Sequence, residues 1–170
     1  IHYENMSIAL AESVANQGQG FINSMAFGNG GTSVDPTGII TYLTPNSTGT
    51  NASLYNQTYS KVVDDRSVTN LDPQRNKIET RHVNGTNYTD VLVTCLLDYG
   101  EPNGQDAVDQ ASQANSLYVF DELGLVSFSP SGTGKLLTHV VFHPVQKSLN
   151  RLVQIDYTVR VQSLTGFNEG

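Results

Sequence analysis

Residues 153–161 alternate strictly between apolar and polar side chains, and this pattern constrains the fold more than any other part of the chain. The apolar positions are Val153, Ile155, Tyr157, Val159 and Val161, with a polar residue between each pair. Successive side chains of a β-strand point to opposite faces of its sheet. The pattern therefore predicts a strand with one buried face and one wet face, which is typical of an antiparallel sheet.

Other apolar or alternating runs, bounded by turn residues, predict further strands. We expect them at residues 21–27, 38–43, 77–83, 90–98, 117–120, 123–128 and 136–142. The run at 90–98 is almost continuously apolar, so we expect it at the centre of a sheet. The two runs within 117–128 form a strand pair or one bent strand, and Pro144 should end the strand that precedes it. The fold class predicted is mainly β, an antiparallel β-sandwich or a twisted sheet.

The beginning of the chain shows helical spacing of its apolar residues, unlike the segments predicted as strands. Met6, Ala9, Leu10 and Val14 recur at helical spacing, which predicts a helix from residue 3 to about Gly18. We therefore divide the chain into an N-terminal helix and arm at 1–37 and a single β domain at 38–170.

Two further segments carry no clear periodic pattern. Residues 44–60 are rich in Asn, Ser and Thr, which indicates an extended arm or an ordered surface loop. Residues 105–113 are expected to form a short helix or an ordered loop.

The charge of the chain excludes several classes of partner. The chain has nine Lys and Arg residues and sixteen Asp and Glu residues, which gives a net charge of -7. The basic residues are scattered along the sequence. A nucleic-acid binder would carry a basic patch, and an anionic membrane surface also attracts cations. We expect neither nucleic acid nor membrane as a partner. The single cysteine, Cys95, lies in an apolar run and is interpreted as a small buried hydrophobe.

Candidate catalytic and metal-binding residues are few. His139 and His143 would lie about 13 Å apart along a strand, which is too far for one metal ion, and His82 could reach His139 only by strand pairing. Residues 28–32 form a glycine cluster, but no Gly-Lys-Ser/Thr follows and no helix opens after it, so a phosphate-binding loop is not predicted.

Asp121 and Glu122 form an adjacent acid pair between two apolar runs. Paired carboxylates can serve acid–base catalysis, but adjacent strand residues point to opposite faces. We interpret the pair as a turn acid and a glutamate that bonds backbone groups or a basic partner. If Glu122 is buried, the candidate partners are Lys135, Lys147 and Arg151. An enzyme would need Glu122, His139 and His143 to converge around a pocket. We expect no enzyme, and neither catalytic, cofactor-binding nor metal-binding residues.

Four segments together resemble the virion proteins of tailed bacteriophages, especially tail-fibre, baseplate and neck components. Residues 120–125 form an acid-Leu-Gly-Leu strand, residues 134–148 a strand with a Leu-Leu pair, a Phe and a Lys, and residues 153–161 the closing alternating strand. Residues 25–32 are similar to a small-apolar stretch with Gly-x-Gly near the start of such proteins.

The resemblance implies a structural virion component without a cofactor, located in the virion. Its partners would be copies of itself, as a homo-oligomer, and other virion proteins in the tail, baseplate or neck. A head decoration protein is a variant of this hypothesis. We expect residues 1–20 and 44–60 to make intersubunit contacts. A different hypothesis is a non-catalytic carbohydrate-binding or adhesion β-sandwich, for which an aromatic platform would be needed. Candidates for that platform are Tyr42, Tyr55, Tyr59 and Tyr88.

Overall fold

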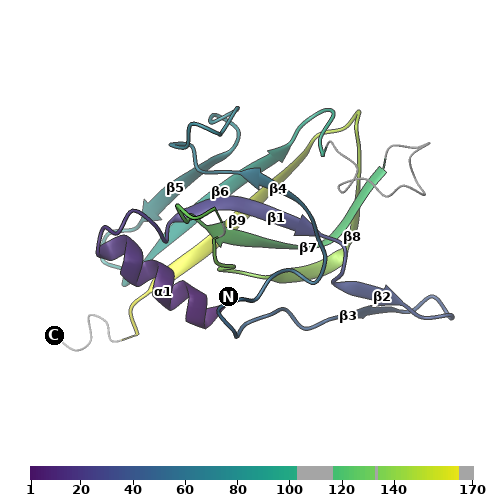
Figure 1. The fold of residues 1–170 in the computed structure, drawn as a ribbon, viewed down its shortest axis with the longest axis horizontal. Coiled ribbons are helices and arrows are strands. Elements are labelled where there is room, and N and C mark those ends of the chain that lie inside the picture. The colour runs from purple at the N-terminus through teal and green to yellow at the C-terminus, as the bar shows by residue number, and fades with distance from the viewer. Residues whose placement is uncertain (103–116, 133, 165–170) are drawn as a thin grey trace.

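A computed structural model describes residues 1–102, 117–132 and 134–164, and Figure 1 shows its fold. The segment at 105–113 lies outside the described residues. The described part is mainly β with one N-terminal helix, which confirms the predicted fold class. Its elements are α1 (Tyr3–Val14), β1 (Ile22–Gly28), β2 (Thr32–Val34), β3 (Ile40–Tyr42), β4 (Gln57–Val62), β5 (Lys77–His82), β6 (Tyr88–Leu97), β7 (Leu117–Ser127), β8 (Val140–Ser148) and β9 (Val153–Gln162).

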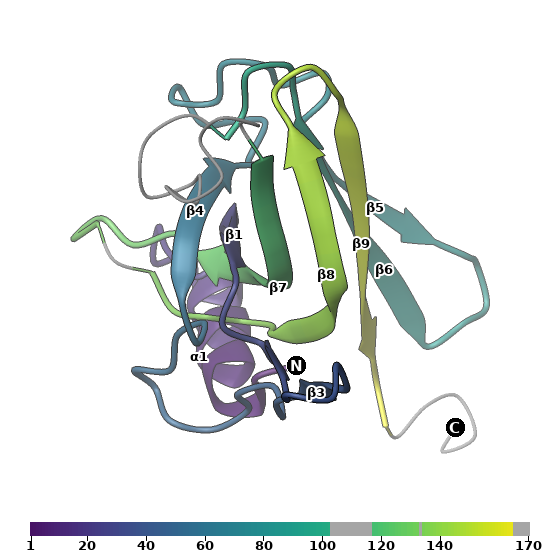
Figure 2. The same cartoon turned by 90° about the vertical axis from the view of Figure 1, so that its right-hand side faces the viewer.

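The strands form two layers and a separate hairpin (Figure 2). A four-stranded sheet has the order β4-β1-β7-β8, and a three-stranded sheet has the order β5-β6-β9. All pairs are antiparallel. The two sheets share one apolar core, in which Phe27 and Phe120 of the first sheet are clustered with Val93 and Val159 of the second. Strands β2 and β3 pair only with each other among the described residues, and they form the hairpin.

The three-stranded sheet follows the sequence pattern closely. β6 lies between β5 and β9, as its apolar run predicted. In β9 the residues at 153, 155, 157 and 159 are more buried than the polar residues between them, which confirms the wet face. The core reaches Cys95 on β6, which is fully buried, as expected of a small hydrophobe.

The four-stranded sheet departs from the sequence prediction at three places. β4 covers 57–62 and begins inside the segment 44–60, which was predicted as an arm or surface loop. β7 is a single strand, as one of the two alternatives predicted, but it runs through Asp121 and Glu122, so the interpretation of Asp121 as a turn acid is wrong. The strand predicted at 136–142 instead begins at Val140 and continues through Pro144 to Ser148, so the prediction that Pro144 ends it is wrong. Proline is tolerated there because β8 is an edge strand and its register with β7 shifts nearby.

Strand β1 ties the beginning of the chain into the β domain. It lies between β4 and β7 in the four-stranded sheet. The boundary suggested at residue 37 falls within the turn of the β2–β3 hairpin. The two predicted ranges therefore interleave in the fold.

Helix α1 packs on the body of the protein through a narrow contact. The His2 side chain caps the helix by accepting the N–H of Asn5, and the Asn5 side chain donates to the carbonyl of Leu136. A Cβ on Gly20 would lie 2.6 Å from the carbonyl oxygen of Ala9, so this close approach requires glycine. Among the described residues, no helix is long and apolar enough to cross a membrane.

Candidate functional site

The acid pair on β7 accepts many hydrogen bonds within the described part of the chain. Asp121 and Glu122 are both buried. The Glu122 carboxylate accepts backbone N–H groups from three residues that are distant in sequence. These are Gly30 at 2.9 Å, Tyr55 at 2.8 Å and Asn56 at 2.9 Å. One side chain therefore joins the loop after β1 to the segment before β4.

His139 provides the fourth hydrogen bond to Glu122. Its Nε2 donates to Oε1 of Glu122 at 2.8 Å, and its Nδ1 accepts the backbone N–H of Asn46 at 2.9 Å. A nitrogen that accepts an N–H carries no proton, so the Asn46 contact requires the neutral tautomer with its proton on Nε2. Both side chains are 0% exposed. Both ring nitrogens are occupied inside the protein, so this pair has no free position for proton exchange with a ligand.

The hydrogen bonds to Glu122 also favour the charged form of its carboxyl group. Burial alone would raise its pKa, but the bonds from His139 and from the backbone N–H groups outweigh burial. They hold the pKa of Glu122 below its ordinary value. The interpretation of Glu122 as a backbone-bonding glutamate is confirmed, whereas the lysine and arginine partners suggested for it are wrong.

Asp121 holds the base of the β2–β3 hairpin. Its carboxylate accepts the N–H of Gly31 at 2.8 Å, the N–H of Thr32 at 2.9 Å and the Thr32 hydroxyl. On the other strand of the hairpin, the N–H of Leu43 donates to the carbonyl of Gly31 at 2.8 Å. The root of the hairpin is therefore fixed on both strands.

The glycine cluster is needed because backbones approach closely at this root. A Cβ on Gly28 would lie 2.4 Å from the carbonyl oxygen of Asn56, and one on Gly30 would lie 2.9 Å from its backbone nitrogen. The loop does bind anions through its N–H groups, but the anions are the chain's own Asp121 and Glu122. Sequence reasoning missed this link, although a glycine cluster and a buried acid pair were both visible.

The hairpin of residues 32–43, called the hairpin arm from here on, has one apolar and one polar face. Thr32 pairs with Tyr42 and Val34 pairs with Ile40, which places these four side chains on one face. The opposite face carries Ser33 and Thr41. Val34 is 63% exposed and Tyr42 is 50% exposed, whereas Thr32 and Ile40 are half-buried, so part of the apolar face is uncovered.

The tip of the hairpin arm is locally ordered. The Oδ1 atom of Asp35 accepts the N–H of Thr37 at 2.9 Å and the N–H of Ile39 at 2.9 Å. Gly38 adopts a φ of 88°, which favours glycine at this turn. The Thr37 hydroxyl and these N–H groups lower the pKa of Asp35. Figure 1 shows the arm extending away from the body of the molecule.

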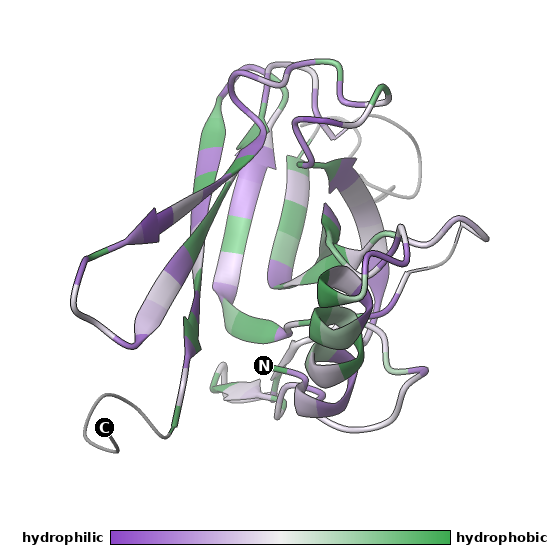
Figure 3. Ribbon diagram, turned by 90° about the vertical axis from the view of Figure 1, so that its left-hand side faces the viewer, coloured by the Kyte–Doolittle hydropathy of each residue, from purple (hydrophilic) through white to green (hydrophobic). Residues whose placement is uncertain are grey.

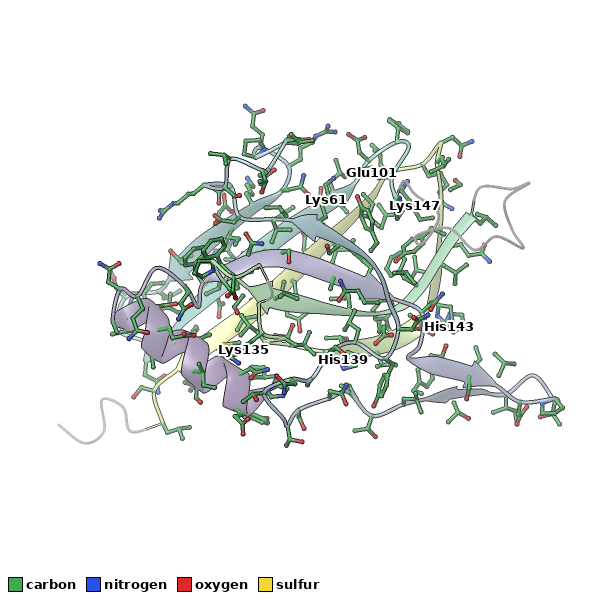
Figure 4. All side chains as sticks on the ribbon, in the orientation of Figure 1. Lys61, Glu101, Lys135, His139, His143 and Lys147 are labelled. Atoms are coloured by element: carbon green, nitrogen blue, oxygen red, sulfur yellow. The ribbon has the colours of Figure 1, made fainter. Side chains whose placement is uncertain are left out.

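A second polar cluster fastens the loop after β6. The ammonium of Lys147 is buried and donates to the carbonyls of Asp98 at 3.0 Å, Glu101 at 2.7 Å and Ser148 at 2.7 Å. Burial lowers the pKa of Lys147, and the nearby charges of Glu101 and Asp98 oppose this effect. Lys61 forms an ion pair with Glu101. Figure 4 shows Lys61, Glu101 and Lys147 together.

The remaining candidates are scattered. His143 is exposed on β8, apart from the buried His139 (Figure 4), and His82 is exposed on β5. The described residues contain no group of three or more His, Cys, Asp or Glu side chains that could hold a metal ion.

The four tyrosines proposed for a sugar platform do not share one surface. Tyr42 lies on the hairpin arm, Tyr59 on the four-stranded sheet and Tyr88 on the three-stranded sheet. Tyr55 packs against His139 with ring centroids 5.3 Å apart, and the Arg160 guanidinium lies 3.8 Å from the ring centroid of Tyr88.

Comparison of the chain with protein-family models, curated proteins and solved structures finds no match.

Proposed function

We propose that this chain is a non-catalytic structural subunit of a tailed-phage virion, in the tail, baseplate or neck, and that its hairpin arm contacts a neighbouring subunit. The observation that carries the proposal is the arm itself. A two-stranded hairpin is at best marginally stable alone, and an apolar face normally packs against another surface. Here Val34 and Tyr42 on that face remain exposed, while the root is held by hydrogen bonds to the buried Asp121.

The order at the root and tip suits a binding role. A flexible arm would lose conformational entropy when it bound a partner, and an arm held in its bound shape loses less. Asp121 fixes the root and Asp35 orders the turn. The hydrogen bonds of the buried acid pair therefore hold the hairpin arm in position.

The buried pair also supports a non-catalytic role. Glu122 and His139 are enclosed, and each of the four contacts of Glu122 is internal to the chain. The sequence segments that resemble phage virion proteins include this pair and the glycine cluster. The resemblance therefore coincides with the residues that hold the arm.

The test of this proposal is the loss of self-association when the apolar face of the arm is removed. We expect Val34→Ser with Tyr42→Ser to weaken association at least about tenfold, because apolar residues at an interface centre carry most of its free energy. Sedimentation velocity over a range of protein concentrations measures the effect.

A matched control is available in the loop after β4. Val68 and Leu71 are 97% and 96% exposed, so Val68→Ser with Leu71→Ser removes comparable apolar groups elsewhere. This control should associate as the wild-type chain does. Equal association of the arm variant and the wild-type chain would contradict the proposal. Location in the virion is tested separately by mass spectrometry of purified particles, which should contain peptides of this chain.

A further inference from the structure

We propose that β9 pairs with β9 of a second copy, antiparallel and about a two-fold axis at Thr158, so that two three-stranded sheets join into one continuous sheet. This inference goes beyond the proposed function, because β9 belongs to the body of the molecule and not to the hairpin arm. A contact in which both copies use the same surface closes at two copies. The arm remains available for a different neighbour.

Strand β9 has a free edge on the side away from β6. Among the described residues it pairs with β6 and with no other strand. β8 belongs to the other sheet, and the two strands diverge toward the end of β9 (Figure 2). The ten residues of β9 keep an unbroken register with β6 and include neither proline nor glycine. Such an edge presents backbone N–H and C=O groups that can pair with another chain.

The other three edges of the two sheets carry features that discourage pairing. β8 includes Pro144, and its register with β7 shifts. β4 has only six residues, and its register with β1 shifts. β5 also has six residues, and Lys77, Glu79 and Arg81 among them are charged. Proteins commonly protect edge strands in these ways, and β9 lacks such protection.

The backbone of β9 determines which residues can pair across its free edge. The N–H of Ser163 donates to the carbonyl of Asn87, and these two residues continue the register of β9 and β6. In an antiparallel sheet, every second residue of a strand bonds a given neighbour. The odd-numbered residues of β9 therefore bond β6, and the even-numbered residues face the free edge. A second copy must pair even-numbered residues with even-numbered residues.

Charge then selects one register. The wet face of β9 carries, in order, Gln154, Asp156, Thr158, Arg160 and Gln162. With Thr158 opposite Thr158 of the second copy, Asp156 of each copy lies opposite Arg160 of the other. Opposite charges directly across two strands stabilise their pairing. A register centred one residue earlier places Asp156 opposite Thr158 and forms no such ion pair.

The row of charges that contains Arg160 favours an incoming carboxylate. Arg160 donates to Asp90 of β6 at 2.8 Å, and Arg81 of β5 lies opposite Asp90 on the other side. Two arginines and one aspartate leave this row with a net positive charge. Addition of Asp156 from a second copy makes the charges alternate across the joined sheet.

The row that contains Asp156 has a place for a cation. Its neighbour on β6 is the uncharged Thr94, and Lys77 follows on β5. Lys77 forms an ion pair with Glu79 at 3.3 Å. Asp156 has no ion pair among the described residues. Arg160 of a second copy would supply a directly opposed cation.

Pairing also covers apolar side chains on the inner face of β9. The same register places Ile155 opposite Val161, and Tyr157 opposite Val159, of the second copy. Val161 is 41% exposed, and Ile155 and Tyr157 are half-buried. Figure 3 shows hydrophobic and hydrophilic residues alternating along β9, the strand that leads to the C-terminus. The joined edge therefore buries apolar groups on one face and pairs charges on the other.

A cysteine at the proposed axis tests the pair directly. Thr158 is exposed and the native Cys95 is fully buried, so Thr158→Cys adds an accessible thiol. Directly opposed strand residues lie within disulfide reach. Mild oxidation should therefore give a disulfide-linked dimer on a non-reducing gel. Glu79→Cys, on the same face at the opposite edge of the sheet, is the matched control and should remain mostly unlinked.

Charge reversal in the Thr158→Cys background tests the register. Asp156→Arg places arginine opposite arginine, and Arg160→Asp places aspartate opposite aspartate. Each should slow cross-linking roughly fivefold at low salt. A one-to-one mixture of the two variants should restore it, because each copy supplies the charge that the other lacks. Recovery in the mixture also shows that neither variant is misfolded, although Arg160→Asp removes the bond to Asp90.

The outcomes separate this inference from the proposed function. Cross-linking of Thr158→Cys no faster than that of Glu79→Cys would overturn the inference and leave the arm contact untouched. Charge variants that cross-link at the parent rate, or a mixture that stays slow, would overturn it as well. Val34→Ser with Tyr42→Ser should leave the cross-link at residue 158 unchanged. Normal cross-linking together with normal association of that arm variant would retain the β9 pair and contradict the proposed arm contact.

Discussion

Glu122 accepts four hydrogen bonds inside the protein and links three chain segments through one carboxylate. Its charge is therefore a structural requirement of the arm's root. Adjacent Asp121 serves the same loop through separate contacts. Together the two carboxylates hold the glycine cluster in place at the root of the arm.

The depressed pKa of Glu122 predicts a specific dependence of stability on pH. A carboxyl group whose pKa is lower in the folded state stabilises the protein above its ordinary pKa, about 4.3. That contribution is lost as the pH falls below this value through the folded-state pKa. We expect Glu122→Gln to flatten the loss of stability in this acid range.

The same variant should be less stable at neutral pH by roughly 2–4 kcal/mol, because the Gln amide would face backbone N–H donors. Urea unfolding as a function of pH measures both effects. Glu79→Gln is a matched control, since the Glu79 side chain is 58% exposed. If the Glu122 and Glu79 variants gave identical pH profiles, the assigned role of Glu122 would be wrong.

At the scale of elements, Lys147 on β8 holds the loop after β6. Replacement by Met would keep most of the buried apolar stem and remove three N–H donors from the carbonyls of Asp98, Glu101 and Ser148. We expect Lys147→Met to destabilise the fold by roughly 2–3 kcal/mol.

Chemical denaturation compares this variant with Lys77→Met, which alters an exposed ion pair with Glu79 on β5. Such surface pairs contribute at most about 1 kcal/mol, so the control should differ little from the wild-type chain. A Lys147 variant as stable as this control would show that the three contacts contribute nothing measurable.

The strands of the three-stranded sheet could be predicted because each carries its own pattern. The alternation of apolar and polar residues in β9 and the apolar run of β6 each indicate which residues of that strand are buried. The start of β8 and the central place of β1 could not be predicted in this way, because both depend on pairing with β7 from a distant part of the sequence.

The candidate site was predictable only in part, for the same reason. The sequence indicates that Glu122 bonds backbone groups, but its partners lie between 17 and 92 residues away. His139 was considered as a metal ligand and, with Glu122 and His143, as part of a catalytic group, but not as a structural hydrogen-bond partner of Glu122. No periodic pattern brings these residues together, because the contact follows from the crossing of the loop after β1 over β7.

For the whole molecule, the exposed apolar residues of the hairpin arm support the proposal of assembly. The hairpin arm projects at one end of the molecule, and α1 lies toward the other end (Figure 1). Residues 44–60, which we also expect to reach a neighbour, are bonded in part to their own chain. Asn46 donates to His139, and Gly49 accepts a hydrogen bond from His2. We propose the arm as a segment that contacts another subunit, because Val34 and Tyr42 on it are exposed.

The central claim is that this chain is built to assemble, and the most direct test is the mass of the wild-type chain in solution. Sedimentation velocity from micromolar to millimolar concentration should show the average mass rising above the 18.4 kDa of one chain. A single 18.4 kDa species at every concentration would contradict the account.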